Sequence, residues 1–241
     1  MSDLIIPDSR FSMPGLFYPG RKPVGNVKID FAHHLARRML YSLSPCGRYD
    51  LVTGRTTDKK AGLNFTVENV GQVVGSSGEG EGVLYLNREL DFSVDEPFSI
   101  FYTSKKFDTS NNGMITGRGA PLNSYLWENE GSNFTVKTES NGNVQFPAAS
   151  SFVFSAFHSV LITSDGGGVS GGNVSLYLNG DLVEVKNGVS FDLTINRVMA
   201  GYLNAFEYTG YLRDFDVFGE CLSARAAKSL HENPYQFLIP A

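Results

Sequence analysis

HSVLITSDGGGVSGGNVSLYLNGDLVEV, residues 158–185, is the stretch of the sequence that decides the fold. Val174, Leu176 and Leu178 alternate with more polar residues, which is the pattern of a β-strand with one buried face. Asn179 and Gly180 follow, and both residue types tolerate the positive φ angles that a two-residue type I′ hairpin requires. The stretch therefore predicts a strand, a glycine-rich loop and a hairpin of two further strands, which needs a partner sheet.

Short apolar segments separated by turn-forming residues recur along the rest of the chain, at the spacing of strands in a β-sandwich. They are residues 63–67, 83–86, 98–103, 122–127, 134–138, 144–146, 191–196 and 198–203. The sequence ARAAKSLH predicts a single short helix, with Ser223 as its cap and Pro234 beyond its end. Residues 28–43 are ambiguous between a helical turn and a strand. The fold class expected from these patterns is all-β.

Composition favours one large domain and excludes some partners. The chain has 241 residues, of which 41% are hydrophobic, and 18 Phe and 11 Tyr can fill a core. The net charge of −5 gives no electrostatic attraction for nucleic acid or for an anionic membrane. No secretion signal and no apolar run of membrane-spanning length is visible, so a cytosolic origin is expected. Cys46 and Cys221 are then expected to be free thiols.

The chain ends differ in character from the middle. Residues 1–27 contain four prolines and are predicted to form an extended arm, which nevertheless carries Phe17 and Tyr18. Residues 233–241 form an apolar tail with Tyr235 and Phe237. These four aromatic side chains are candidate anchors for a partner, because buried aromatic residues dominate binding energies. The arm could alternatively lie across its own domain.

Four motifs resemble those of a known superfamily. FHSVLITSDG with NVSLYLNGDLV is similar to the core hairpin of laminin-G-like domains in the concanavalin A-like lectin/glucanase superfamily. GYLRDFDVFGECLSARAAKSLHENPY resembles the closing strand and short helix of that superfamily, DEPFSIFYTS resembles an inner strand, and IDFAHHLARRML with YDLVTG resembles the opening strand and turn. The resemblance covers about residues 28–236. It implies a two-sheet antiparallel β-sandwich, or jelly roll, over residues 28–232.

The combination of the N-terminal arm with the ending ENPYQFLIPA is similar to proteins encoded by tailed bacteriophages. This resemblance implies a non-enzymatic virion structural protein, with capsid decoration or stabilisation as the first expectation. The implied partners are the major capsid protein, other virion proteins or sister copies in a homo-oligomer. The implied location is the virion, and the host cytoplasm during assembly.

Carbohydrate binding is the alternative function. Sugar sites commonly pair an aromatic face with amides and carboxylates, and Tyr125, Trp127, Asn129 and Glu130 offer that combination. Trp127 is the only tryptophan of the chain. A lone tryptophan on a strand is also a common core residue. Host-glycan recognition by a fibre or tail-associated protein is therefore the second hypothesis.

No enzyme site is predicted. Retaining glucanases of this superfamily carry an E-x-D-x-E-like strand motif, which places carboxylates on one face about 5–5.5 Å apart. The nearest pattern here, WENEG, has Glu128 and Glu130 but lacks the third acid of that motif. We interpret this pattern as a solvated strand end. His158 and His231 have no evident Ser or Cys partner in the sequence, so nucleophilic catalysis is not expected either.

Metal binding is not expected to be a main role. His33 and His34 are neighbours in sequence, so their side chains diverge, and no Cys or carboxylate completes a ligand set. Asp165, or Glu79 with Glu81, could supply oxygen atoms to calcium, which needs six to eight of them. No cofactor is predicted, and calcium remains a minor alternative.

Overall fold

The structure is a computed structural model that describes residues 27–44, 51–53, 62–64, 66–67, 73–74, 83–106, 113–117, 125–128, 133–138, 142–147, 155–198 and 210–240. Within these residues the chain forms two packed antiparallel sheets, a two-stranded ribbon and one α-helix. The all-β prediction is confirmed. No helix in the described part of the chain is long and apolar enough to cross a membrane.

The sheet that carries the helix, called the helix-side sheet below, has the strand order β15-β14-β13-β8-β17-β2-β3, with β6 also paired to β17 and β5 to β6. Its strands are β2 (Met39–Ser44), β3 (Leu51–Thr53), β5 (Thr66–Val67), β6 (Val73–Val74), β8 (Phe98–Lys106), β13 (His158–Ser164), β14 (Gly172–Leu178), β15 (Asp181–Val189) and β17 (Gly210–Phe218).

The second sheet, called the far sheet below, has the order β12-β11-β10-β9-β16-β7-β4. Its strands are β4 (Gly62–Asn64), β7 (Val83–Phe92), β9 (Gly113–Gly117), β10 (Tyr125–Glu128), β11 (Asn133–Thr138), β12 (Gly142–Pro147) and β16 (Leu193–Val198). Non-consecutive neighbours such as β16 and β7 show that the chain crosses between the sheets, as in a jelly roll.

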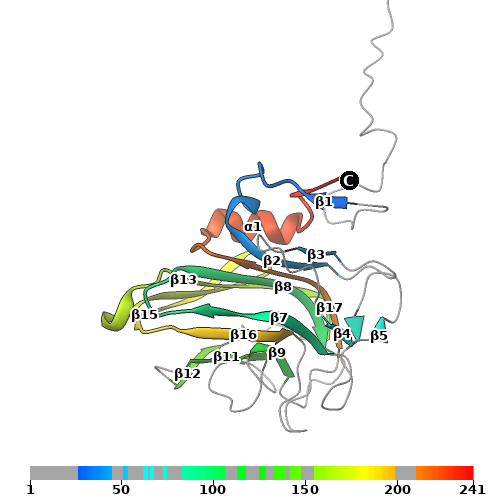
Figure 1. The fold of residues 1–241 in the computed structure, drawn as a ribbon. Coiled ribbons are helices and arrows are strands. Elements are labelled where there is room, and N and C mark those ends of the chain that lie inside the picture. Colours follow the sequence, from blue (N-terminus) through cyan, green and yellow to red (C-terminus); the bar gives the residue numbers. More distant parts are fainter. Residues whose placement is uncertain are drawn as a thin grey trace, which may run out of the picture.

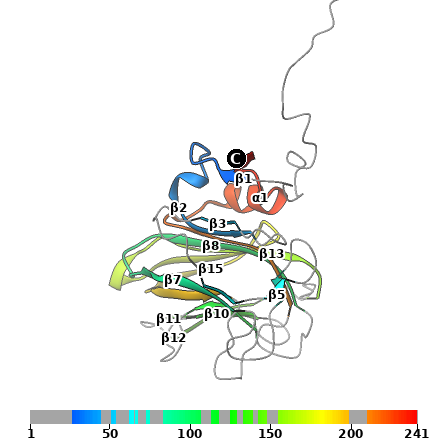
Figure 2. The same ribbon diagram turned by 45° about the vertical axis from the view of Figure 1, so that its right-hand side comes forward.

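A third layer covers the outer face of the helix-side sheet (Figures 1 and 2). It consists of helix α1 (Ala224–Glu232) and a ribbon in which β1 (Val27–Ile29) pairs with β18 (Leu238–Pro240). Val27 is the partner of Pro240 in this ribbon, so the two terminal strands of the described chain lie side by side. The segment before residue 27 therefore joins the domain in the same layer as α1.

The main core lies between the two sheets. Alternate residues along the strands supply it, including Phe98, Ile100 and Tyr102 from β8 and Val174 and Leu176 from β14, all at most 1% exposed. Fully burying one such side chain contributes roughly 1.5–3 kcal/mol relative to leaving it in water. This core fixes the two sheets face to face.

A second apolar cluster joins the helix-side sheet to the third layer. The opposite faces of the same strands supply Phe101 and Leu161, and α1 adds Ala226, Ala227 and Leu230. Strand β13 is consequently buried along its whole length, because both of its faces are covered. Strand β14, for which the sequence predicts one buried face, also buries Tyr177 in this cluster, because the sequence pattern does not reveal the third layer.

The predicted hairpin is confirmed in its other details. Strands β13, β14 and β15 follow one another with antiparallel pairing. Asn179 has a φ of 51° and Gly180 a φ of 85°, as a type I′ turn requires. The ambiguous segment 28–43 resolves into the end of β1, a 3₁₀ turn at Ala36–Arg38 and β2. The strand predicted at 191–196 corresponds to β16, and the one predicted at 198–203 lies outside the described residues beyond Val198.

The predicted tail is part of the domain core. Tyr235 is 4% exposed and Phe237 is 2% exposed, and both belong to the second apolar cluster together with Leu238. The backbone N–H of Asp30 donates to the carbonyl oxygen of Phe237 at 2.8 Å. This burial within the chain corrects the prediction that Tyr235 and Phe237 are anchors for a partner.

Candidate functional site

Helix α1 forms where the sequence predicts it. The hydroxyl of Ser223 accepts a hydrogen bond from the backbone N–H of Ala226 at 3.3 Å, which satisfies one of the free donors of the first turn. Ala226, Ala227 and Leu230 lie on one side of the helix and are buried against the helix-side sheet. The other side of the helix is consequently left to solvent.

The solvent side of α1 carries charge. Arg225, Lys228 and Glu232 are exposed and recur at spacings of three and four residues, so they lie along one stripe of the helix. Two hollows lie beside this stripe, and both are lined by Arg225 and Ser229. Arg225 and Ser229 therefore separate the two hollows, while Lys228 and Glu232 line the second one.

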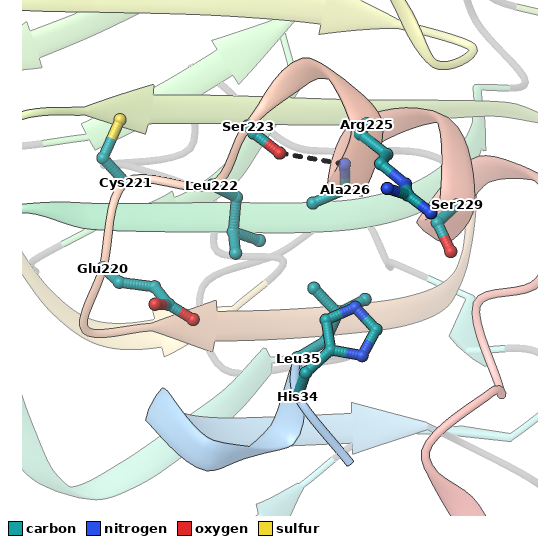
Figure 3. A pocket seen from close by; sticks show the side chains of 9 residues that line it. All are labelled: His34, Leu35, Glu220, Cys221, Leu222, Ser223, Arg225, Ala226 and Ser229. Atoms are coloured by element: carbon teal, nitrogen blue, oxygen red, sulfur yellow. Dashed lines mark hydrogen bonds between the residues drawn. The ribbon is translucent and has the colours of Figure 1, made fainter.

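The first hollow, called the Arg225 groove below, has a volume of about 630 Å³. This volume is within the range of roughly 300–1,000 Å³ found for ligand sites. The groove is lined by His34, Leu35, Glu220, Cys221, Leu222, Ser223, Arg225, Ala226 and Ser229. These residues come from three segments that are far apart in sequence: the turn before β2, the connection from β17 to α1, and α1 itself. Figure 3 shows Glu220 and Arg225 on opposite sides of Leu222.

The groove combines an apolar floor with opposite charges at its sides. Leu222 is 5% exposed and Leu35 is 3% exposed, and both belong to the second apolar cluster. Within the part of the chain that the structure describes, neither Glu220 nor Arg225 forms an ion pair. The groove therefore offers one free carboxylate and one free guanidinium to a ligand that carries both charges.

The second hollow lies between α1 and the β14–β15 turn, and its volume is about 690 Å³. It is lined by Gly180, Asp181, Leu182, Ala224, Arg225, Lys228, Ser229 and Glu232. A Cβ atom on Gly180 would lie 3.0 Å from the Cα atom of Lys228, so a larger residue in the turn would press against the helix. The hairpin that the sequence predicts thus forms one wall of this hollow.

Two titratable groups near the Arg225 groove have shifted pKa values. Burial raises the pKa of the Cys221 thiol, which a hydrogen bond with Thr163 partly offsets. Cys221 is free, as the sequence predicts, while Cys46 lies outside the described residues. Burial also lowers the pKa of His33, whose ring lies 4.5 Å from that of His34. At neutral pH the thiol is consequently protonated and a poor nucleophile.

Polar side chains also meet inside the main core. His158 Nε2 lies 2.9 Å from Glu128 Oε1 and 3.0 Å from the hydroxyl of Ser104, which donates to Glu128 Oε1 at 3.1 Å. Glu128 and Ser104 are 0% exposed and His158 is 2% exposed. The interpretation of Glu128 as a solvated strand end is therefore wrong, and so is the expectation that His158 lacks a serine partner.

This cluster differs from a catalytic triad in its geometry. In a triad the two imidazole nitrogens are divided between the acid and the nucleophile. Here Nε2 of His158 contacts both Glu128 and Ser104, while Nδ1 lies 3.0 Å from the carbonyl oxygen of Ala156. The cluster is also closed to solvent, so it is a polar connection between β8, β13 and β10. The other predicted histidine, His231, has a serine partner as well, because its Nδ1 lies 2.8 Å from the hydroxyl of Ser159.

Most of the residues predicted for glycan or partner binding lie outside the described residues or have side chains that the structure does not describe. Phe17, Tyr18, Asn129 and Glu130 belong to the first group. Tyr125 and Trp127 are placed as backbone positions of β10, where Trp127 pairs with Thr135 of β11. The site residues that the sequence reasoning missed are those of the Arg225 groove, of which only Ser223 carried a local signal.

No group of three His, Cys, Asp or Glu side chains in the described residues could hold a metal ion. Asp165, considered for calcium, is instead bonded to Asn173, whose backbone N–H and side-chain amide each donate to it at 2.8 Å. These contacts close the base of the glycine-rich loop. Glu79 and Glu81 lie outside the described residues.

Comparison with known proteins supports the fold. No protein-family model and no curated protein matches the sequence. Among solved structures, the chain is similar to the binding domain of botulinum neurotoxin DC, solved in complex with rat synaptotagmin II, with a TM-score of 0.57, 17% identity, and coverage of 84% of this chain and 53% of that one. It is also similar to the binding domain of Paraclostridial Mosquitocidal Protein 1, with a TM-score of 0.58, 12% identity, and coverage of 82% and 52%.

A third similar structure is that of botulinum neurotoxin type C, with a TM-score of 0.55, 19% identity, and coverage of 86% of this chain and 53% of that one. The chain thus spans about half the length of the structures that it matches. At these identities the likeness shows a shared fold, a β-sandwich.

Proposed function

We propose that this domain acts by binding a partner and not by catalysis, and that the face carrying α1 is its docking face. The observation that supports this proposal is the Arg225 groove, where Glu220 and Arg225, neither of which forms an ion pair within the described residues, stand above an apolar floor. The acid and the histidine that could serve catalysis, Glu128 and His158, are closed inside the core. Similarity to binding domains of toxins agrees with this proposal.

For the biological role, we propose a structural protein of a virion, most simply one that decorates or stabilises a capsid. The resemblance of the arm and the C-terminal ending to phage proteins supports this role. The pairing of β1 with β18 adds that the arm joins the domain in the layer of α1. Phe17 and Tyr18 of the arm are the proposed anchors, and the shell protein or sister copies are the proposed partners, in the virion and in the host cytoplasm during assembly.

Incorporation into purified particles tests this role. We expect deletion of residues 1–25 to reduce incorporation strongly, and Arg225→Glu to reduce it as well. Gln145→Glu is the matched control, because Gln145 is exposed on β12 of the far sheet, away from α1. Unchanged incorporation of both the deletion and Arg225→Glu would reject the proposed docking face.

Glycan binding is the second candidate function. The observation that favours it is the similarity in fold to botulinum neurotoxin type C, whose cell entry is described as dependent upon interaction with two ganglioside molecules. A glycan array probed with wild type, Trp127→Ala and Arg225→Ala separates the two sites that could serve it. Retention lost only in Trp127→Ala would support the site around Trp127, and no retention of any glycan by wild type would reject this function.

A further inference from the structure

The Arg225 groove needs an occupant that is apolar in part and carries both signs of charge. Its floor, formed by Leu35, Leu222 and Ala226, is the outer side of the second apolar cluster. Glu220 and Arg225 stand on opposite sides of Leu222 (Figure 3). None of the described residues that line the groove is a Phe, Tyr or Trp on whose ring a sugar could stack. A peptide segment fits this chemistry better than a saccharide does.

The sequence of this chain contains such a segment. Residues 8–11, Asp-Ser-Arg-Phe, place an acidic and a basic residue two positions apart, directly before an aromatic one. In an extended peptide the side chains of residues 8 and 10 lie about 7 Å apart on the same side. Asp8 is complementary to Arg225 and Arg10 to Glu220, and both side chains can point into the groove at the same time.

The point where this segment joins the domain allows it to reach the groove. Residues 12–26 separate Phe11 from β1, and 15 extended residues span up to about 50 Å, which is comparable to the diameter of a domain of this size. Ile29 of β1 belongs to the same apolar cluster as Leu35, Leu222 and Ala226. A tether of this length gives an effective concentration of the order of millimolar, so weak contacts are enough for docking within one chain.

The C-terminal segment of the chain packs on the domain through apolar side chains. Tyr235, Phe237 and Leu238 leave α1 and return to the same cluster, although their sequence has the appearance of a free tail. These three side chains cover part of the second apolar cluster. The Arg225 groove lies over another part of the same cluster. A second terminal segment could therefore cover the remaining apolar surface by the same physical means.

We propose that residues 8–11 of the same chain dock in the Arg225 groove, with Asp8 paired to Arg225 and Arg10 to Glu220. Docking holds the following segment, PGLFYPG at residues 14–20, over the α1 face. The groove thereby positions Phe17 and Tyr18 for a partner. The mechanism of docking is independent of the partner, but its use in presenting these aromatic residues rests on the proposed function.

Hydrogen–deuterium exchange of the isolated full-length protein tests the proposal. In wild type, the amides of residues 8–11 are expected to exchange about tenfold more slowly than in Arg225→Glu, because charge repulsion of Asp8 releases the segment. Lys228→Glu is the matched control: it makes the same reversal on the same helix, but Lys228 lines only the second hollow. It is expected to leave the exchange unchanged.

A double variant in which the two charges are swapped tests the predicted pairing directly. The double variant Asp8→Arg with Arg225→Glu restores opposite charges and is expected to recover the slow exchange that each single variant loses. Fast exchange of residues 8–11 in wild type, or a double variant that exchanges as fast as the singles, would overturn the proposal. Protection that rises with protein concentration would overturn it too, because it would show docking in a second copy.

The outcome is distinguishable from that of the proposed function. The exchange experiment contains no partner, so it reports only on docking within the chain. If residues 8–11 are unprotected while Arg225→Glu still reduces incorporation into particles, the docking face stands and the intramolecular occupant is rejected.

Discussion

Glu128 and His158 connect the two sheets of the sandwich: Oε1 of Glu128, on β10 of the far sheet, lies 2.9 Å from Nε2 of His158, on β13 of the helix-side sheet. Both side chains are fully buried in the main core. A buried pair of this kind costs desolvation energy when it forms, so its net contribution to stability is small. Removal of one partner is expected to destabilise the fold, because the other buried polar group then loses this contact.

The first prediction concerns this pair. Glu128→Leu and His158→Leu are each expected to lower the free energy of unfolding by about 3 kcal/mol, since each leaves the remaining polar partner buried. The double variant replaces both groups by apolar ones and is expected to be less destabilised than the sum of the two. Urea unfolding measures the three values. Strict additivity would show that the contact between Glu128 and His158 carries no coupling.

The second prediction concerns Asp216, which is buried on β17 with Ser42 and Asp214 as polar neighbours. Burial raises the pKa of Asp216 well above its ordinary value of 3.8, against the opposing effect of the hydrogen bond with Ser42. The folded state therefore holds a proton that the unfolded state releases as pH rises above about 4. Stability from this group is present below that pH and is lost as pH rises toward the folded-state pKa.

Asp216→Asn cannot release the proton and is expected to flatten the dependence of stability on pH over this range. Urea unfolding of wild type and variant between pH 4 and pH 8 is the measurement. We expect the stability of Asp216→Asn relative to wild type to increase with pH. A constant difference between the two proteins across the range would contradict the raised pKa.

The sequence predicts those parts of this fold that depend on local patterns. The alternation around Val174 and Leu176 gives the strand, Asn179 with Gly180 gives the turn, and Ser223 gives the start of α1; all three are confirmed. Alternation on β10 also indicates that Glu128 is buried. Leu126 and Glu128 are two residues apart on one strand, and both are 0% exposed, so Glu128 follows Leu126 into the core.

The candidate site is not predictable in the same way. The Arg225 groove joins a turn at residues 34–35 to residues 220–229, and the two meet only because β2 and β17 are neighbours in the sheet. No local sequence pattern predicts the pairing of β2 with β17. The burial of Tyr235 and Phe237 has the same origin, because an apolar tail is consistent both with a partner and with the chain's own cluster.

The last prediction concerns the contact between the hairpin and the helix. Gly180 has a φ of 85°, and a Cβ atom there would lie 3.0 Å from the Cα atom of Lys228. Gly180→Ala is therefore expected to lower the free energy of unfolding through two effects, backbone strain of about 1 kcal/mol and displacement of α1 from the sheet. Thermal unfolding measures the sum of the two.

Gly188→Ala separates these effects. Gly188 has a φ of 68°, and nothing lies within 4 Å of a Cβ atom placed there, so this variant carries the backbone strain alone. We expect Gly180→Ala to be more destabilised than Gly188→Ala, and also to alter exchange protection along α1 while Gly188→Ala does not. Equal destabilisation and unchanged protection of α1 in both variants would mean that the turn does not hold the helix. Since the turn and the helix together form the second hollow, this comparison also reports whether the hairpin shapes the docking face.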